Sequence, residues 1–254
     1  MEQDIFEQKQ NIQFCDVDMQ NRLTMKGVLR LMQEAANCHS DLAGYGLNHI
    51  EKTDFSWVLH QQKCRLYSRP RWNTKLQIRT WSRGADGLIC LRDFEVLDEA
   101  GNLVALASSG WLLVCASTQK LERVPEGMLE KYGRADRAVF SEPLPRLKPL
   151  SLEEKLWTYT VQHRDIDINR HVNNLCYLDY AWEALRCRRA EKAEELWDKY
   201  NEVDILYKKA AFAHDRLACF GGWEREENED SSFTVAVKDE DGKLLHAVIR
   251  LGKG

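Results

Sequence analysis

The sequence predicts an α+β fold built from two similar units, each a central helix wrapped by an antiparallel β-sheet. Two observations indicate it. Motifs in the first half of the chain recur in the second half. In each half, one helical pattern also precedes a series of strand patterns. The chain has 254 residues, which is enough for two domains of ordinary size.

The repeat is clearest at two pairs of aspartates. Asp16-Val-Asp18 and Asp165-Ile-Asp167 lie 149 residues apart. Six residues after each second aspartate stands a residue type that commonly caps helices, Thr24 in the first copy and Asn173 in the second. Turn sequences of the form Asp-Glu-x-Gly also recur, at Asp98 and at Asp239. We interpret these matches as a tandem duplication.

In the first half, Thr24 is expected to cap a helix, because apolar residues recur with a 3.6-residue period from Met25 to Ala36. Gly44 and Gly46 are candidate stop signals for that helix. Runs of alternating or continuous apolar residues then predict strands. The expected strands are 57–66, 75–81, 89–97 and 103–114.

In the second half, Asn173 is expected to cap a helix with Leu175, Leu178, Trp182 and Leu185 on one face. Charged residues dominate its continuation to residue 199. The strands expected after it are 204–211, 216–223, 232–238 and 244–251.

Proline marks the boundary between the units. Three of the five prolines, Pro143, Pro145 and Pro149, lie close together, and such a run favours an extended connector. We therefore expect a first unit at residues 1–135, a linker at 136–149 and a second unit at 150–254.

The composition excludes several classes of function. The net charge of −4 argues against a general nucleic-acid binder. No apolar run reaches the roughly 18 residues of a membrane span, and the acidic start lacks a secretory signal. The eight cysteines are scattered without a C-x-x-C pair, so they predict reduced thiols and no metal site. These features predict a cytoplasmic protein.

The second copy of the repeat carries the candidate chemistry. Asp167, Asn169 and His171 stand at alternate positions, which would point to one side of an extended segment. The predicted helix that follows would offer free backbone N–H groups. A carboxylate to activate water and N–H groups to hold an oxyanion suit acyl transfer. The first copy has Gln20 and Arg22 instead, so we expect one chemical copy and one supporting copy.

Each candidate also has a structural interpretation. Asp167 is a common residue type in turns, and His171 alone is more often structural. Cys176 is a possible nucleophile because it lies beside the motif. A reactive thiol needs an electropositive, partly exposed setting, however, and a position one turn into an amphipathic helix favours a packing role. Further candidates for substrate binding are Asn173, Asn174, Trp182 and Met32, and these residue types serve equally well as caps or core.

Several motifs resemble those of one family. Asp167-Ile-Asn169-Arg-His171-Val-Asn173-Asn174-Leu-Cys-Tyr177, with Trp182-Glu183 after it, resembles the signature of plant and bacterial acyl-ACP thioesterases. The resemblance covers nearly the whole chain. In the first half it rests, in the same order, on Leu31-Met-Gln33-Glu34-Ala35-Ala36, Ser68-Arg-Pro70-Arg-Trp72, Arg79-Thr80-Trp81 and Ser108-Ser109-Gly-Trp111.

The resemblance implies a double hotdog fold with the active residues in the second hotdog and the acyl chain bound by the first. It implies hydrolysis of fatty acyl-ACP to free fatty acid and ACP, in fatty acid biosynthesis, without a cofactor or metal. Asp167 would activate water or attack directly. Asn169 would position the water or the carboxylate, and His171 would polarise a group or donate a hydrogen bond.

One departure from the family leaves alternatives open. Many members carry Glu, often followed by Cys, where this chain has Ala210-Ala211. Either Asp167 is the base without help, or activity is reduced. An acyl-CoA thioesterase and a non-catalytic acyl-binding protein are the rival functions. The sequence leaves the acyl length, the carrier and a homodimer open.

Basic residues are candidates for docking an acidic carrier protein. One group follows the second helix and the other follows the strand at 204–211. The alternative for the first group is a solvated face balanced by nearby glutamates. The first group is Arg186, Arg188, Arg189 and Lys192, and the second is Lys208 and Lys209.

Overall fold

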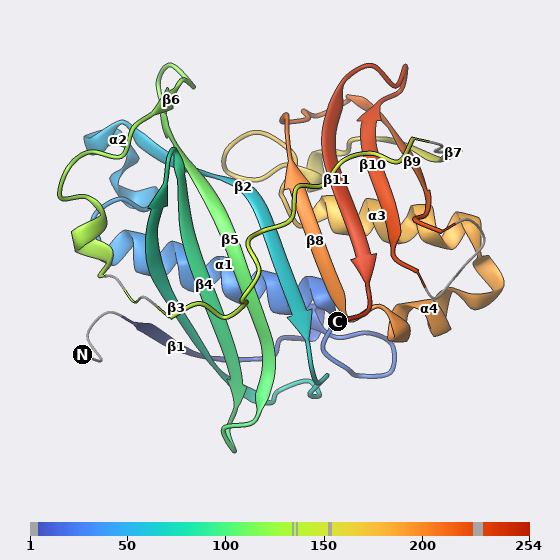
Figure 1. Cartoon of the computed structure of the whole chain (residues 1–254), viewed down its shortest axis with the longest axis horizontal. Coiled ribbons are helices and arrows are strands. Elements are labelled where there is room, and N and C mark those ends of the chain that lie inside the picture. The colour runs from blue at the N-terminus through green and yellow to red at the C-terminus, as the bar shows by residue number, and fades with distance from the viewer. Residues whose placement is uncertain (1–4, 134, 136, 152–153, 226–230) are drawn as a thin grey trace. The chain divides into compact units, whose positions relative to one another are not determined.

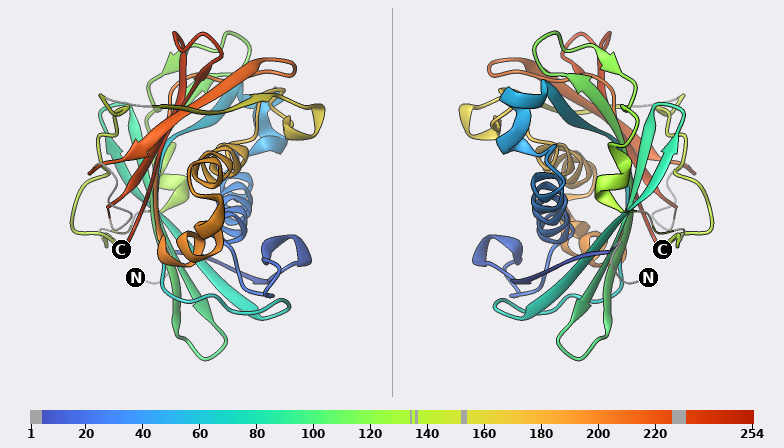
Figure 2. Two further views of the ribbon diagram at one scale, coloured as in Figure 1. Left: turned by 90° about the vertical axis from the view of Figure 1, so that its right-hand side faces the viewer. Right: turned by 90° about the vertical axis from the view of Figure 1, so that its left-hand side faces the viewer.

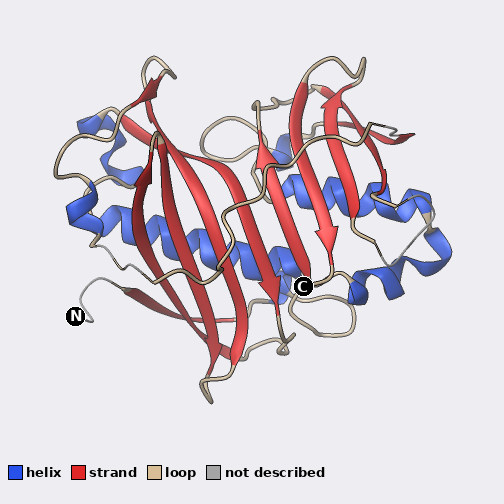
Figure 3. Ribbon diagram, viewed as in Figure 1, coloured by secondary structure: helices blue, strands red, loops and turns tan. Residues whose placement is uncertain are grey.

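The computed structural model of the protein describes the whole chain except residues 1–4, 134, 136, 152–153 and 226–230. The chain divides into two compact units, Met1–Leu144 and Pro145–Gly254 (Figure 1). In each unit the longest helix lies along one face of an antiparallel sheet (Figures 2 and 3). The predicted α+β class and the predicted order of one helix before several strands are therefore confirmed.

Unit 1 has the strand order β1-β3-β4-β5-β2, and the short β6 pairs with β5. All four expected strands are present, and β3 continues beyond its expected end at residue 81. The strands are β1 (Phe6–Asn11), β2 (Phe55–Leu66), β3 (Lys75–Asp86), β4 (Ile89–Asp98), β5 (Leu103–Cys115) and β6 (Leu121–Glu122). The helices are η1 (Phe14–Asp16), α1 (Met25–Leu42), η2 (Leu47–His49), α2 (Ile50–Thr53) and η3 (Leu129–Tyr132).

Helix α1 forms as the sequence predicts. The Thr24 Oγ1 accepts the Gly27 N–H at 2.9 Å, which confirms the expected cap. The helix ends at Leu42, and Gly44 follows with a φ of +82°. Its buried face packs on the sheet and forms the core of unit 1. That face comprises Met25, Val28, Leu29, Leu31, Met32, Ala35, Ala36 and His39.

Unit 2 repeats this plan with the strand order β8-β11-β10-β9-β7. The expected strand at 216–223 has the observed bounds, and the later two differ by one residue at each end. The strands are β7 (Glu154–Thr160), β8 (Glu202–Tyr207), β9 (Arg216–Trp223), β10 (Phe233–Asp239) and β11 (Leu245–Gly252). The helices are η4 (His163–Asp165), α3 (Cys176–Arg188), η5 (Ala190–Lys192) and α4 (Ala193–Lys199).

The expected cap of α3 is wrong. The helix begins at Cys176 with Leu175 as its N-cap, not at Asn173. The Asn173 Oδ1 instead accepts the Leu175 N–H at 2.9 Å, so it stabilises a turn ahead of the helix. The equivalent position in α1 explains the difference. There, a Cβ on Gly27 would stand 2.5 Å from the Asp16 carbonyl oxygen, so only glycine lets a helical turn approach that carbonyl.

The expected strand at 204–211 is too long. β8 ends at Tyr207, where the N–H groups of Lys208 and Lys209 both point to the His246 carbonyl at 2.8 and 3.3 Å. The backbone leaves the sheet there, so Ala210 and Ala211 lie in a loop.

Part of the expected linker packs on unit 1. The Trp81 Nε1–H donates to the Arg137 carbonyl at 2.8 Å, and the Val139 N–H donates to the Asp93 Oδ2 at 2.9 Å. The division after Leu144 nevertheless falls inside the proline-containing stretch. No helix among the described residues is long and apolar enough to cross a membrane.

Candidate functional site

The repeated loop has one backbone scaffold in both units. The Asp165 carbonyl accepts the Asn173 N–H at 2.8 Å, and the Asp16 carbonyl accepts the Thr24 N–H at 2.9 Å. Each of these first aspartates also accepts the N–H of the residue three positions earlier through its carboxylate, at 2.8 Å. The sequence repeat is therefore also a repeat of hydrogen bonds, and residues 149 positions apart can be compared one by one.

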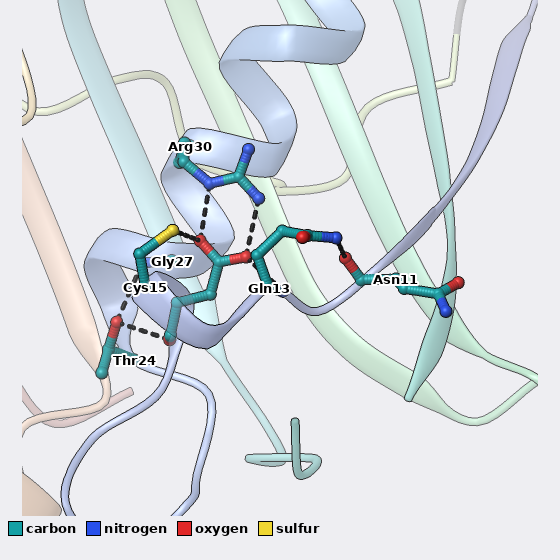
Figure 4. Close-up of polar contacts among 7 residues, drawn as sticks. Asn11, Gln13, Cys15, Thr24, Gly27 and Arg30 are labelled. Atoms are coloured by element: carbon teal, nitrogen blue, oxygen red, sulfur yellow. Dashed lines mark hydrogen bonds and ion pairs between the residues drawn. The ribbon is translucent and has the colours of Figure 1, made fainter. Parts of the chain in front are cut away.

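Asp16 and Asp165, the first aspartates of the two loops, have different side-chain partners. Asp16 is buried and binds the Arg30 Nε and Nη2 at 2.6 Å each (Figure 4). Asp179 occupies the position of Arg30 in unit 2. There, the Tyr159 hydroxyl donates to the Asp165 Oδ2 at 2.8 Å. Sequence reasoning did not give these anchors a role, although their presence in both copies was a usable signal.

The candidate residues of unit 2 lie in a tight turn. The Asp167 N–H donates to the His171 carbonyl at 3.0 Å, and the Arg170 N–H donates to the Asp167 carbonyl at 2.9 Å. Arg170 has a φ of +65°. The expected extended segment is therefore wrong, because these backbone bonds reverse the chain. The turn itself, and not strand alternation, brings the backbones of Asp167 and His171 together.

Asp167 stabilises this turn with one carboxylate oxygen. Its Oδ1 accepts the Asn169 N–H at 2.8 Å, as the Asp18 Oδ1 accepts the Gln20 N–H at 2.9 Å. The turn interpretation is thus correct for Oδ1 in both copies. Asp167 is half-buried and Asn169 is exposed, so the loop remains open to a substrate.

The second carboxylate oxygen distinguishes the copies. In unit 1 the Arg22 Nε and Nη2 donate to the Asp18 Oδ2 at 3.1 and 3.0 Å. His171 occupies the equivalent position in unit 2, where its Nδ1 lies 3.3 Å from the Val172 carbonyl. In the part of the chain that the structure describes, the Asp167 Oδ2 accepts no hydrogen bond. A carboxylate oxygen available to a water molecule therefore exists only in the second copy of the loop.

The contact of His171 favours one tautomer. A carbonyl oxygen can only accept, so a hydrogen bond here places the proton on Nδ1 and makes the Nε2 of the neutral ring an acceptor. The neutral imidazole is therefore suited to accept a hydrogen bond from water, and donation from Nε2 requires the protonated ring. Of the roles expected for His171, hydrogen-bond donation by Nε2 is therefore disfavoured while the ring is neutral.

One backbone donor lies at the start of α3. The Cys176 N–H donates to the Asn173 carbonyl at 2.9 Å, and the Leu175 N–H is taken by the Asn173 side chain. Within the described residues, the Asn174 N–H donates no hydrogen bond. Its carbonyl is held by the Tyr207 hydroxyl at 3.2 Å, which fixes the orientation of this residue. The Asn174 N–H is thus the candidate donor to an oxyanion.

The loop after β8 lies against the candidate turn. The Val172 N–H donates to the Ala211 carbonyl at 2.8 Å. Ala211 is fully buried, whereas Ala210 is exposed. The positions that carry Glu and Cys in many family members are therefore next to the turn, but here they offer only methyl groups.

Tyrosines surround the inner side of this region. Tyr177 packs on Tyr180 and Tyr207 with ring centres 5.8 and 5.7 Å apart. Burial raises the pKa of all three hydroxyls above the usual range. They stay protonated near neutral pH and cannot serve as bases.

The other candidates have structural surroundings. Cys176 directs its thiol to the Asp165 carbonyl at 3.8 Å, which favours the packing interpretation over a nucleophile. Trp182 packs on Trp197 with ring centres 4.2 Å apart. Met32 is fully buried on the sheet-facing side of α1 in unit 1. Their roles in substrate binding stay predictions.

The two basic groups differ in their partners. Arg186 pairs with Glu183 at 3.0 Å, and Arg188 pairs with Glu154 at 2.5 Å. Lys208 and Lys209 are exposed, and neither forms an ion pair within the described residues. They directly precede Ala210, beside the candidate turn.

Comparison with known proteins gives a consistent result. A family model described as the acyl-ACP thioesterase N-terminal domain matches residues 3–132, and one described as the C-terminal domain matches residues 151–249. The chain is 24% identical over 202 residues to oleoyl-acyl carrier protein thioesterase 2 of Arabidopsis thaliana, which covers 71% of the chain and 54% of that protein. It is 27% identical over 197 residues to dodecanoyl-[acyl-carrier-protein] hydrolase of Cinnamomum camphora, covering 71% and 51%. The chain thus spans about half the length of these curated relatives.

Solved structures share the fold over the whole chain. An acyl-ACP thioesterase from Bacteroides thetaiotaomicron has a TM-score of 0.84 and 25% identity, covering 98% of both chains. The 12:0-ACP thioesterase from Umbellularia californica has a TM-score of 0.81 and 20% identity, covering 98% of this chain and 96% of that one. These likenesses confirm the predicted hotdog fold.

Proposed function

Because the two family models together match most of its length, the chain belongs to the acyl-ACP thioesterase family, and we propose that it hydrolyses fatty acyl-ACP to free fatty acid and ACP. One observation carries the assignment to unit 2. The Asp18 Oδ2 is occupied by Arg22, whereas the Asp167 Oδ2 accepts no hydrogen bond within the described residues. Unit 1 is then the supporting unit that binds the acyl chain.

In the proposed mechanism, Asp167 takes a proton from water while the water oxygen attacks the thioester carbonyl carbon. The Nε2 of His171 accepts the second hydrogen bond of that water, and the exposed Asn169 amide orients the water or the carboxylate. The carbonyl oxygen becomes an oxyanion held by the Asn174 N–H. In the alternative route, the Asp167 carboxylate attacks the carbonyl directly and expels the thiolate, and water then hydrolyses the resulting acyl–aspartate anhydride, which releases the fatty acid, restores the carboxylate and supplies the proton for the thiolate.

The second step breaks the bond between carbon and sulfur. The electron pair of that bond leaves with the sulfur, and the proton on Asp167 returns to the thiolate. A thiol has a pKa of roughly 8.5, so its departure does not require a strong general acid. One carboxylate is therefore sufficient for both proton transfers. Neither step requires a cofactor or a metal.

We further propose an acyl carrier protein as the carrier. The similar curated proteins are named for acyl carrier protein substrates. Lys208 and Lys209, which form no ion pair within the described part of the chain, provide positive charge beside the turn for an acidic partner, although the chain as a whole carries −4. The proposal includes a cytoplasmic location. All eight cysteines are free thiols, and the cytosol keeps thiols reduced. A homodimer stays a prediction.

The test is kcat/KM on matched panels of acyl-ACPs and acyl-CoAs of several chain lengths. The proposed function predicts rapid turnover with a preference for the ACP panel. A preference for the CoA panel would identify an acyl-CoA thioesterase. Tight acyl binding without turnover would support the non-catalytic alternative, which Ala210 and Ala211 motivate.

A further inference from the structure

The strands β2 and β8 end in the same way in the two units. The N–H groups of the two residues that follow β8 both point to the His246 carbonyl, and those of the two residues that follow β2 both point to the Val104 carbonyl. The last residues of the two strands therefore correspond, and they are Leu66 in unit 1 and Tyr207 in unit 2. Unit 2 thus carries a hydroxyl group at a position where unit 1 carries only an alkyl side chain.

The hydroxyl of Tyr207 fixes a peptide group at the start of α3. Burial raises the pKa of this hydroxyl above its usual range, so it stays protonated and donates to the Asn174 carbonyl at 3.2 Å. That carbonyl belongs to the peptide group that joins Asn174 to Leu175. The N–H of the same peptide group donates to the Asn173 Oδ1 at 2.9 Å. This peptide group is therefore held at both ends.

The peptide group that joins Asn173 to Asn174 is held only at its carbonyl. That carbonyl accepts the Cys176 N–H at 2.9 Å, whereas the Asn174 N–H donates no hydrogen bond within the described residues. A peptide group is planar, and only two backbone dihedrals join it to the next one. The hold of Tyr207 on the second peptide group therefore restricts the direction in which the Asn174 N–H of the first one points.

We propose that Tyr207 is a positioning residue for the hydrolysis, whose hydroxyl keeps the Asn174 N–H directed at the oxyanion. This inference rests on the proposed function. A preorganised donor acts on the charge that develops in the transition state, and it contributes little to binding of the ground-state substrate. Tyr207 should therefore support kcat and leave KM nearly unaffected. In unit 1, Leu66 has no side-chain donor for this purpose, which agrees with a supporting role for that unit.

The first experiment compares the steady-state kinetics of Tyr207→Phe and Tyr180→Phe on one good acyl-ACP. Tyr180 is the matched control, because both rings pack on Tyr177 but the buried Tyr180 hydroxyl has no hydrogen-bond partner within the described residues. Tyr207→Phe should lower kcat by about 10–100-fold, less than the loss of a whole oxyanion donor, with KM within about twofold of the wild type. Tyr180→Phe should change neither constant.

The pH dependence of this loss separates positioning from acid–base chemistry. A hydroxyl that stays protonated does not titrate between pH 5 and 9, so Tyr207→Phe should lower kcat by the same factor throughout this range. A loss that changed with pH would mean that Tyr207 takes part in proton transfer, and would overturn the inference.

The second experiment observes the donor directly. A fatty acyl-N-acetylcysteamine thioester, labelled with ¹³C at its carbonyl, is bound to Asp167→Asn, which should hydrolyse it slowly. A hydrogen bond from the Asn174 N–H would polarise the carbonyl and lower its infrared stretching frequency relative to the free thioester. We expect this lowering in Asp167→Asn alone and with Tyr180→Phe added, and we expect Tyr207→Phe to abolish it. A merely structural role of Tyr207 would leave the frequency lowered.

Two further results would overturn the inference. One is a kcat of Tyr207→Phe equal to that of Tyr180→Phe, and the other is a reduced kcat with the carbonyl frequency still lowered. Should Tyr207→Phe fail to fold, an unchanged frequency in the Asp167→Asn complex would overturn it alone. If the wild type hydrolyses no thioester, the proposed function fails, and the carbonyl frequencies in the wild type and in Tyr207→Phe then decide the inference separately.

Discussion

Arg22 and His171 occupy the same position in the two copies of one loop, but among the described hydrogen bonds only the Arg22 side chain binds the carboxylate of the aspartate four residues before it. Arg22 donates two hydrogen bonds to the Asp18 Oδ2, whereas His171 turns its Nδ1 to the Val172 carbonyl. The exchange of Arg22 for His171 therefore distinguishes the Asp18 carboxylate, which is bound by a guanidinium, from the Asp167 carboxylate, which can act on water.

Asp167→Asn should lower the single-turnover rate by roughly 10²–10⁴-fold, the usual effect of losing a positioned base. The protein should still fold, because the Asn side-chain oxygen can replace the Oδ1 that accepts the Asn169 N–H. Asp18→Asn is the matched control in unit 1 and should change turnover only a few-fold. Near-normal rates in the Asp167 variant, measured with melting temperatures for both proteins, would contradict the proposed site.

His171→Arg should convert the second loop to the arrangement of the first. The new guanidinium would bind the Asp167 Oδ2, as Arg22 binds the Asp18 Oδ2, and would remove the carboxylate from contact with water. We expect kcat/KM to fall at least about 10²-fold, by the same argument of a lost base. The reverse exchange, Arg22→His, should leave turnover nearly unchanged. Equal losses in the two variants would mean that the loops do not differ in function.

Gly27 and Cys176 should differ in their tolerance of substitution. Gly27→Ala would place a methyl 2.5 Å from the Asp16 carbonyl oxygen, and such overpacking costs about 1–3 kcal/mol of unfolding free energy. Cys176→Ala should cost less and should retain activity, because the thiol is directed to a backbone carbonyl, that of Asp165, at 3.8 Å. Denaturant unfolding and turnover measure the two effects. Loss of hydrolysis in folded Cys176→Ala would revive the nucleophile hypothesis.

Periodicity and caps predicted the elements whose stability is local. The 3.6-residue apolar period and the Thr24 cap located α1, and alternation located β9. The start of α3 was missed because it depends on a close approach between the helix and a carbonyl. Gly27 permits that approach to the Asp16 carbonyl in unit 1, whereas the side chain of Cys176 does not permit the equivalent approach to the Asp165 carbonyl. The turn at Asp167 was missed because alternating polar residues resemble a strand until their backbone hydrogen bonds are known.

The sequence could predict which residues make up the candidate site, but not how their side chains are arranged. The repeat showed which residues were exchanged between the copies, including Arg22 for His171. Sequence alone could not show that Arg22 neutralises Asp18, because a pairing four residues apart depends on the shape of the turn. Arg92 on β4 is buried, and this too was hidden in the sequence, since a charged residue within a strand pattern normally faces solvent.

Charge reversal at Lys208 and Lys209 should raise KM for acyl-ACP and weaken its dependence on salt, because exposed charges act mainly on the encounter with a charged partner. Reversal of Arg186 should have a smaller effect, since this side chain is paired with Glu183. The measurement is KM at several ionic strengths. Turnover of a short acyl-N-acetylcysteamine thioester, which has no carrier protein, is the control and should barely change. Equal loss on both substrates would indicate damage to the site instead of lost docking.

Ala210→Glu tests whether one carboxylate is sufficient. Ala210 is exposed, so the longer side chain can be accommodated without disturbing the core. The Ala211 carbonyl holds the Val172 N–H, so a carboxylate at position 210 would lie near the turn that contains Asp167. Two neighbouring carboxylates disfavour double ionisation and raise one of the two pKa values. If Asp167 is the base, activity should not increase, and the acidic limb of the pH–rate profile should move to higher pH.

The outcome of this substitution separates the enzyme from the acyl-binding alternative. The comparison is kcat/KM of wild type and Ala210→Glu on one good acyl-ACP from pH 5 to 9, with Ala210→Gln as the uncharged control of similar size. A rise of more than about tenfold in the Glu variant only, from a nearly inactive wild type, would show that a positioned general base had been missing. That result would identify the natural chain as an acyl-binding protein that has lost its catalytic carboxylate. An active wild type with an unchanged or slower Glu variant would instead establish that the turn at Asp167 performs the hydrolysis without a second acid.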